Sequence, residues 1–430
     1  MNMNKNNCLN LVFFIFTFCQ LSVLTGCKES QQRSVLLELA AETHENYNLA
    51  EEEQTLARNG NDFSINFFRK IVEEEGEKNV FVSTIGMFYS LSIINNGASG
   101  QTRQEICDAL NIDTADIERV NKFCRRLMIG QAKEIEDEFF GSSYMRTATL
   151  FQAGNRVNIA PSFQEILQHD YFANIISGDI DGAQQQMIDK WCAVQTERLL
   201  SSFPVKETDG GSANLFVANF FNGRWVQKFD KESTKKEPFK GGISPTVNMM
   251  NKTENEEVFS YAKLDDFSML MIPYAAGYRL YVILPDKIDG LASLLQSLDG
   301  KKLRTAMSQL KSYNYTYVKI PKFEVDYSLN ANNCLASLGV GRMFSDHAEL
   351  NRIQSDPMKI GEIVQKTKVI LDEEGTRAGA ITSGSFVTLG EEMNPTEAYF
   401  YADHPFAYII QDPFDNYCFM GTFWGDSQVD

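Results

Sequence analysis

The chain is poor in the residues from which most catalytic and metal-binding sites are built. Its 430 residues include four histidines and eight cysteines, and no two cysteines form a Cys-x-x-Cys pair. It also lacks the Gly-x-Ser-x-Gly turn of hydrolases, the His-Glu-x-x-His helix of zinc peptidases and the glycine-rich loops that bind nucleotides. These absences argue against an enzyme of those classes. We therefore predict no metal ion, no cofactor and no catalytic activity.

Positive charge is scarce as well. The chain has 40 Lys and Arg against 57 Asp and Glu, which gives a formal net charge of −17. Because phosphate contacts need clustered basic residues, we predict that nucleic acid is not a partner. Hydrophobic content of 43% and charged content of 23% are typical of a globular chain and exclude a disordered or collagen-like one.

A long, mostly apolar run occurs at residues 9–24. It is short for a membrane-spanning helix and is typical of the central region of a secretory signal. It ends in Leu24-Thr25-Gly26-Cys27, which resembles the bacterial lipobox, where a cysteine is lipidated and becomes the mature N-terminus. We predict a lipoprotein signal peptide over residues 1–26 and lipid on Cys27. The alternative is a plain secretory signal that contains a cysteine.

Lipidation implies a location. Several fatty chains on one residue anchor a protein stably, so a membrane becomes a partner through the N-terminal lipid. We expect the chain in a bacterial cell envelope, at the outer membrane or cell surface, or otherwise facing the periplasm. Five cysteines remain after processing, an odd number that favours small buried hydrophobes over a disulfide framework or a zinc site. They are Cys107, Cys124, Cys192, Cys334 and Cys418.

The rest of the chain reads as one large unit. Residues 27–58 are polar and acidic, which predicts a tether, and we expect folded structure from Asn61-Asp62, a pair that can cap a helix over residues 63–72. No linker or repeat divides residues 59–430. Predicted helices come first and predicted strands, including 317–325 and 366–371, dominate the last third. This order favours an α+β domain with a mixed or antiparallel sheet.

The segment between residues 366 and 405 is unusual. A predicted strand at 366–371 is followed by a segment that is long for a loop in a compact domain, and long ordered loops are often functional. Alternate residues from Thr376 are all small, and in a strand they would share one face. The pattern fits a flexible surface loop and also a strand packed inside a sheet. The small set is Thr376, Ala378, Ala380, Thr382 and Gly384.

Short motifs in a fixed order then connect this segment to a family. Glu373-Glu374-Gly375-Thr376 and the small residues after it resemble the hinge of the reactive-centre loop of serpins. The resemblance covers most of the chain from about residue 58. The other motifs are Asn79–Ser83, Gly97–Thr102, Phe220–Trp225 with Phe229 and Pro238-Phe239, Val247–Met250, Leu284–Asp286, Ile320–Phe323, Asp403–Phe406 and Phe419–Gly421.

The resemblance implies a fold and a mechanism. It implies about nine helices and three β-sheets, with an exposed reactive-centre loop at about 373–398. It also implies a monomeric serine endopeptidase inhibitor: a protease acylates the loop, and the cut loop inserts into the largest sheet and distorts the protease. The residues that this implies for the hinge are Glu373, Glu374, Gly375, Thr376, Ala378, Ala380 and Thr382.

Counting along the loop suggests the bond that a protease would cut. In inhibitory relatives the residue before the cut is commonly the seventeenth from the glutamate that opens the hinge, which gives the bond between Leu389 and Gly390. Phe386 and Met393 are the alternatives. All three suit an apolar specificity pocket, so we expect chymotrypsin-like, elastase-like or subtilisin-like targets, with a cysteine protease as a further option.

The resemblance assigns Ser83, Trp225 and Gln365 to the region where the sheet opens, and the chain departs from the family there. Thr84-Ile85-Gly86 replaces the usual Pro-x-Ser, Gln365 replaces a histidine, and Asn219 lies two residues beyond the usual asparagine. Two rival interpretations remain open, and these departures support the first. One is a non-inhibitory relative that acts as a binding protein or a plain substrate. The other is a lipid-anchored hydrolase that pairs a cysteine with His404 or His169.

Overall fold

The computed structural model describes residues 32–43, 47–134, 141–205, 210–254, 258–376 and 397–426. Within these ranges it has ten α-helices, nine of them with seven residues or more, and three β-sheets. This confirms the predicted α+β fold. The helices are 32–42, α2 (Glu51–Glu75), α3 (Thr84–Gly97), α4 (Gly100–Leu110), α5 (Ile117–Ala132), α6 (Pro161–Asp170), α7 (Gly182–Gln195), α8 (Leu291–Ser297), α9 (Gly300–Ser308) and α10 (Asn332–Ser337).

The first long helix begins earlier than predicted. α2 starts at Glu51, where the backbone N–H of Ala50 donates to the Glu53 carboxylate at 2.9 Å. Three glutamates in the first turn also favour the positive end of the helix dipole. The predicted cap at Asn61 is wrong, because Asn61 lies buried inside the helix and its amide bonds to the backbone of Asp415 and Tyr417.

A six-stranded sheet has the order β12-β13-β14-β4-β2-β3. Its two longest strands, β13 and β4, pair in parallel from Lys359 with Ser212 to Lys366 with Ala218. Near the other end of β13, the two-residue strand β14 lies between them and is antiparallel to both. The strands are β2 (Tyr144–Ala153), β3 (Asn174–Ser177), β4 (Ser212–Arg224), β12 (Phe323–Asn330), β13 (Lys359–Asp372) and β14 (Gly375–Thr376).

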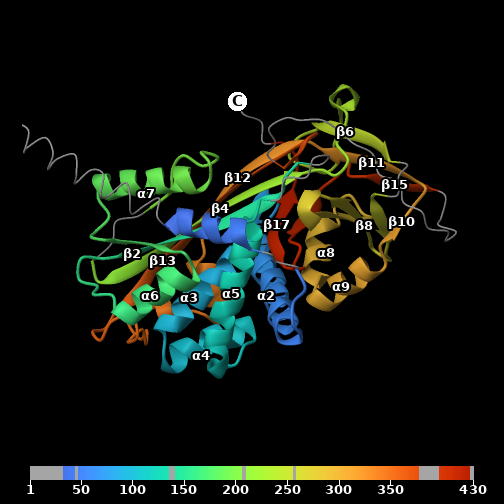
Figure 1. The fold of residues 1–430 in the computed structure, drawn as a ribbon. Helices are drawn as coiled ribbons and strands as arrows, with labels where there is room; N and C mark the ends of the chain where they lie inside the picture. The colour runs from blue at the N-terminus through green and yellow to red at the C-terminus, as the bar shows by residue number, and fades with distance from the viewer. Residues whose placement is uncertain are drawn as a thin grey trace, which may run out of the picture.

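The two faces of the six-stranded sheet are covered by different helices. Leu215 of β4 packs into the main core with α3 and α5, whereas Phe216 packs with Ile188 and Trp191 of α7 into a second, smaller core. Figure 1 shows α7 on one side of the sheet and α2, α3, α4 and α5 on the opposite side. Since Val364 of β13 also joins the smaller core, α7 covers the junction of β13 with β4.

A seven-stranded antiparallel sheet forms the other wall of the main core, in the order β1-β17-β16-β9-β8-β7-β10. All residues of α3 are buried, and this helix lies between β4 and β17. The strands are β1 (Val80–Ser83), β7 (Ser260–Lys263), β8 (Phe267–Pro273), β9 (Arg279–Pro285), β10 (Lys311–Ser312), β16 (Phe406–Gln411) and β17 (Tyr417–Phe423).

A four-stranded sheet with the order β15-β11-β6-β5 completes the fold. Its strand β15 pairs in parallel with β11 and is an edge strand. The predicted strand 317–325 is in fact two strands in different sheets, which meet at Pro321 and Lys322. The strands here are β5 (Lys235–Pro238), β6 (Thr246–Glu254), β11 (Tyr315–Pro321) and β15 (Glu397–Tyr401).

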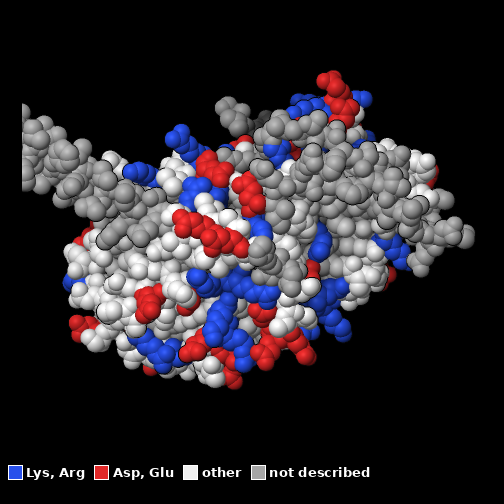
Figure 2. All heavy atoms as spheres, viewed as in Figure 1, with Lys and Arg blue, Asp and Glu red and all other residues white. Residues whose placement is uncertain are grey.

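The surface carries both signs of charge. Figure 2 shows Lys, Arg, Asp and Glu side chains intermixed over the helical part of this face. No helix in the described part of the chain is long and apolar enough to cross a bilayer. In the described ranges, no cluster of three His, Cys, Asp or Glu is arranged to hold a metal ion.

Candidate functional site

The hinge already occupies a strand position in the six-stranded sheet. Thr376 lies opposite Leu371 of β13 on one side and Gly223 of β4 on the other, and Gly375 lies between Asp372 and Arg224. The segment is therefore a strand at its start, in agreement with the buried-strand alternative. Residues 377–396 lie outside the described residues, and with them Ala378, Ala380, Thr382, Phe386, Leu389, Gly390 and Met393; Cys27 does as well.

Gly375 is required by the turn that leads into β14. Its φ is +144°, a value that side-chain-bearing residues rarely adopt. A Cβ at this position would lie 2.0 Å from the carbonyl oxygen of Gly223. Any other residue would force the hinge away from β4, so the glycine allows this early strand pairing.

Thr376 is the first member of the small set, and it is 2% exposed. Its Oγ1 lies 2.6 Å from the hydroxyl of Tyr274, in a hydrogen bond. Tyr274 stacks on Trp225 with ring centroids 4.2 Å apart. The Thr376 side chain is therefore buried beside the stacked rings of Tyr274 and Trp225, a place that favours a small residue.

Trp225 fastens the turn before the hinge. Its indole Nε1–H donates to the Asp372 carbonyl at 2.9 Å, and its backbone N–H donates to the Glu374 carbonyl at 3.2 Å. The ring is fully buried. Trp225 thus holds residues 372–374 against the end of β4, and it lies beside the hinge.

The two hinge glutamates form separate ion pairs. The Glu373 carboxylate accepts from Lys322 Nζ and from Thr234 Oγ1, each at 2.8 Å. Burial acts to raise the pKa of Glu373, but these hydrogen bonds outweigh it and the pKa is lowered. Glu374 pairs with Lys228 at 2.8 Å and Lys231 at 3.3 Å, and the hydrogen bond from Lys228 is the main cause of its lowered pKa. Both carboxylates are therefore anions that hold the turn in place.

Further along β13 from the hinge, Gln365 of the six-stranded sheet meets Ser83, which ends β1 of the seven-stranded sheet. The Gln365 side chain accepts from the Ser83 backbone N–H and donates to the Ser83 carbonyl, both at 2.8 Å. The Ser83 hydroxyl caps α3 by accepting from the Gly86 N–H at 3.2 Å. Gln365 therefore locks β13 to the start of α3 with an amide that does not titrate, at the position where the family has a histidine.

Gly86 leaves room for Asn219. A Cβ on Gly86 would lie 2.7 Å from Asn219 Oδ1 and 3.0 Å from Ser83 Oγ. Asn219 Oδ1 accepts from Thr147 Oγ1 at 3.1 Å, while its buried Nδ2 has no hydrogen-bond partner among the described residues. The departures at positions 86 and 219 thus compensate each other. The space left by the missing side chain of Gly86 in α3 is filled by the side chain of Asn219 in β4.

The three residues assigned to sheet opening therefore occupy two places. Ser83 and Gln365 bond to each other in the middle of β13. Trp225 instead lies beside the hinge and bonds to Asp372, which is seven residues after Gln365 in β13, or roughly 23 Å away at strand spacing. Sequence reasoning missed the contribution of Tyr274, for which no motif gives a signal. It also missed that of Lys322, although this residue is part of the quoted Ile320–Phe323 motif.

The structure does not assemble a cysteine–histidine pair within its described ranges. All five cysteines described are free and buried, as predicted, and burial raises the pKa of Cys124, Cys192 and Cys334 to about 12. Such thiols are poor nucleophiles. Both ring nitrogens of His404 are already engaged, with Asp403 at 2.8 Å and the Pro285 carbonyl at 2.7 Å.

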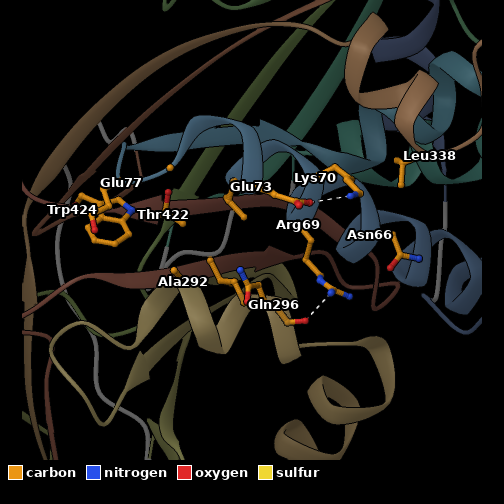
Figure 3. Close-up of a pocket in the computed structure, with 13 residues that line it drawn as sticks. Asn66, Arg69, Lys70, Glu73, Glu77, Ala292, Gln296, Leu338, Thr422 and Trp424 are labelled. Atoms are coloured by element: carbon orange, nitrogen blue, oxygen red, sulfur yellow. Dashed lines mark hydrogen bonds and ion pairs between the residues drawn. The ribbon is translucent and has the colours of Figure 1, made fainter.

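A cavity of about 500 Å³ lies away from the hinge, between α2, α8 and the end of β17. Figure 3 shows Arg69, Lys70 and Glu73 of α2 opposite Gln296 of α8, with Trp424 at one end. The Arg69 guanidinium donates to the Gln296 carbonyl at 2.6 Å. None of the predicted site residues lines this cavity.

Comparison with known proteins places this geometry in context. A family model described as "Serpin (serine protease inhibitor)" matches residues 58–425. A leukocyte elastase inhibitor of Sus scrofa is 30% identical over 377 residues, covering 84% of this chain and 96% of the relative. A serine proteinase inhibitor 2 of Variola virus is 27% identical, with 84% and 98% covered.

Two solved structures have the same fold. The thermophilic serpin tengpin in its native state aligns with a TM-score of 0.75 at 24% identity, covering 88% of this chain and 95% of tengpin. Human thyroxine-binding globulin in complex with its hormone aligns with a TM-score of 0.76 at 19% identity, covering 87% and 100%.

Proposed function

Because the chain belongs to the serpin family, we propose that it inhibits serine endopeptidases as a suicide substrate. The observation that carries this proposal is the position of β14, whose residues Gly375 and Thr376 already separate the ends of β13 and β4. A strand that has started in the gap can be extended by the small residues that follow it in the sequence.

The resemblance to serpins implies the mechanism, and the position of β14 is compatible with it. The protease serine attacks the reactive-site carbonyl; an ester forms, the peptide bond breaks, and the new amine leaves with the C-terminal part of the loop. The freed end then extends β14 along the gap, and this requires the parallel pairing of β13 with β4 to open. About a dozen residues at ~3.3 Å each carry the acylated protease roughly 40 Å. The protease supplies all the catalytic groups.

We propose the Leu389–Gly390 bond as the reactive bond, with Phe386 and Met393 as alternatives, and a monomer as the active form. The targets would be serine proteases with apolar specificity pockets, of the chymotrypsin, elastase or subtilisin kind. Two of the relatives are leukocyte elastase inhibitors, which supports this class of target protease.

A denaturing gel tests the inhibitor proposal. Residues 28–430 are mixed with chymotrypsin, pancreatic elastase, subtilisin and trypsin, and the released peptide is identified by mass spectrometry. We expect a band stable to boiling at the summed mass of protease and clipped chain, and a peptide that begins at Gly390. Cleavage in the loop with free, active protease in every mixture would contradict the proposal.

We also propose that Cys27 carries lipid and anchors the chain in a bacterial envelope. The sequence of residues 9–27 supports this, and the helix over residues 32–42 lies beside α7, on the opposite side of Figure 1 from β15. A lipid anchor on the side of helix 32–42 would leave the side of β15, the strand that follows the reactive-centre loop, accessible to proteases. Mass spectrometry of the mature N-terminus should find an acylated Cys27, and Cys27→Ala should move the protein to the soluble fraction; an unmodified N-terminus would refute the anchor.

The cavity between α2 and α8 favours a second candidate function, a non-inhibitory binding protein. Trp424 lines this cavity, and its buried indole N–H has no hydrogen-bond partner among the described residues, so a ligand could accept from it once the ring turns toward the cavity. Calorimetric titration with thyroxine, the hormone bound by one structural relative, tests this candidate. Binding that Trp424→Phe abolishes would support it, and the absence of binding would remove a ligand of that kind.

A further inference from the structure

An exposed group of tyrosines covers the outer face of β15 and β11. We call Tyr315, Tyr317, Tyr399 and Tyr401 the tyrosine face. Three of these tyrosines are well exposed: Tyr315 is 46% exposed, Tyr399 52% and Tyr401 42%. Side chains alternate strictly along β15, since Ala398 and Phe400 are buried on the other side. The tyrosines are therefore not needed to fill the core.

The rings of the tyrosine face are held in place. Tyr317 lies opposite Tyr399 in the register of β11 and β15, and the two rings stack with centroids 4.7 Å apart. Tyr401 packs edge-on against Tyr399 at 6.2 Å, and the Tyr399 hydroxyl donates to Glu397 at 2.6 Å. Fixed aromatic rings lose little conformational entropy on binding and are frequent in the energetic centres of interfaces.

The position of this face indicates its partner. β15 begins at Glu397, seven residues after Gly390, so a protease at the proposed bond sits within about 25 Å of extended chain from the tyrosine face. A protease of about 230 residues has a radius of gyration of roughly 17 Å and is about 45 Å across. A body of that size, bound at the proposed bond, can reach the tyrosine face.

We propose that the tyrosine face is a second contact surface for the target protease, which it binds beside the active-site cleft before acylation; this rests on the proposed inhibitory function. The face suits a protease surface that offers apolar groups and arginine or lysine. Such cations can stack on the rings, as Lys319 already lies 5.5 Å from the ring of Tyr401. The contact raises the rate of complex formation and does not affect insertion.

The test compares Tyr399→Ala/Tyr401→Ala with the control Met187→Ala/Val194→Ala, which removes two exposed side chains from α7. The first readout is the second-order rate constant for covalent complex formation with leukocyte elastase and with chymotrypsin. The second is the affinity for chymotrypsin whose nucleophilic serine is replaced by alanine, which binds without acylation. We expect both to fall at least tenfold in the tyrosine variant, with the stoichiometry of inhibition unchanged, and to stay within twofold in the control.

If the rates and affinities of Tyr399→Ala/Tyr401→Ala stay within twofold of wild type for both proteases, the proposal that the tyrosine face binds the protease is wrong. Failure of the proposed inhibitory function gives another result, because wild type then forms no covalent complex with either protease. The affinity for the inactive chymotrypsin, compared between wild type and the tyrosine variant, still tests whether the tyrosine face binds the protease. If the double variant does not fold by circular dichroism, Tyr401→Ala alone serves, because it leaves the stack of Tyr317 on Tyr399 intact.

Discussion

At the scale of single residues, the hinge depends on how little space surrounds Thr376. Thr376→Arg would place a charge against Tyr274 and Trp225, where an uncompensated cation costs several kcal/mol. We expect the variant to be cut as a substrate, with a stoichiometry of inhibition roughly tenfold or more above wild type. Titration of a fixed amount of chymotrypsin measures this. Thr376→Val, which keeps the shape, is the control, and equal stoichiometries for Arg and Val would contradict the tight fit.

The pair of Gly86 and Asn219 makes a prediction about packing. Gly86→Ser would force its side chain against Asn219 Oδ1, and overpacking of this kind costs about 1–3 kcal/mol of unfolding free energy. Asn219→Ala should remove the clash, so the double variant should recover part of the loss. Urea unfolding of the single and double variants gives the coupling energy. Additive losses would mean that the two positions do not compensate each other.

Asp412 gives the molecule a pH-dependent term in stability. It is fully buried, accepts from Gln131 and Asn416, and burial raises its pKa to about 6, above the ordinary value of about 3.9. A raised pKa in the folded state stabilises the fold below about pH 4, and this contribution is lost as pH rises through 6. The difference in unfolding free energy between wild type and Asp412→Asn should therefore favour wild type by up to about 3 kcal/mol more at pH 4 than at pH 7.

Glu373 and Glu374 have lowered pKa values, so their contributions to the unfolding free energy change with pH in the opposite direction. These contributions are the same in wild type and in Asp412→Asn, so they cancel in the difference between the two proteins. A difference that does not change with pH would show that Asp412 titrates normally.

At the scale of elements, β13 is held in its middle by side-chain hydrogen bonds to β1, from Gln365 to Ser83 and from Thr367 to the Phe81 carbonyl, and at its end by the hinge turn. Gln365→Leu removes both hydrogen bonds to Ser83 and leaves a buried N–H and C=O unsatisfied, at a cost of about 2–4 kcal/mol. We expect lower stability and faster spontaneous loss of inhibitory activity on incubation, because β13 separates more easily from α3. Lys366→Gln, on the opposite side of the strand, is the control. An equal rate of loss in both variants would contradict a lock at Gln365.

The elements also show what the sequence could predict. The alternation of small residues from Thr376 is compatible with a buried strand or a surface loop; Thr376 itself is a buried strand residue, and the rest of the small set lies outside the described residues. Asn61 looked like a helix cap, but its amide bonds to residues more than 350 positions away, and no local pattern reports such contacts. The division of 317–325 at Pro321 has a local signal, since proline cannot donate to a ladder. The role of Tyr274 has none, because it arises only when the residue that follows β8 meets Thr376 of β14 in the folded chain.

At the scale of the whole molecule, loop insertion requires the six-stranded sheet to accept a longer strand. β14 lies between β13 and β4 at two positions, and further along β13 and β4 pair with each other. Insertion would exchange one parallel pairing for two antiparallel ones. About a dozen new backbone hydrogen bonds at about 1 kcal/mol net each would stabilise the cut chain by on the order of 10 kcal/mol.

The most direct test of this account is thermal unfolding by circular dichroism before and after one cut in the loop. A gain on the order of 10 kcal/mol should raise the unfolding temperature of the cut, still associated chain by roughly 10 to 30 °C. Thr376→Arg, cut in the same way, should gain much less. An unfolding temperature that stays the same or falls after the cut would contradict loop insertion, and with it the central claim that the hinge is the start of a missing strand.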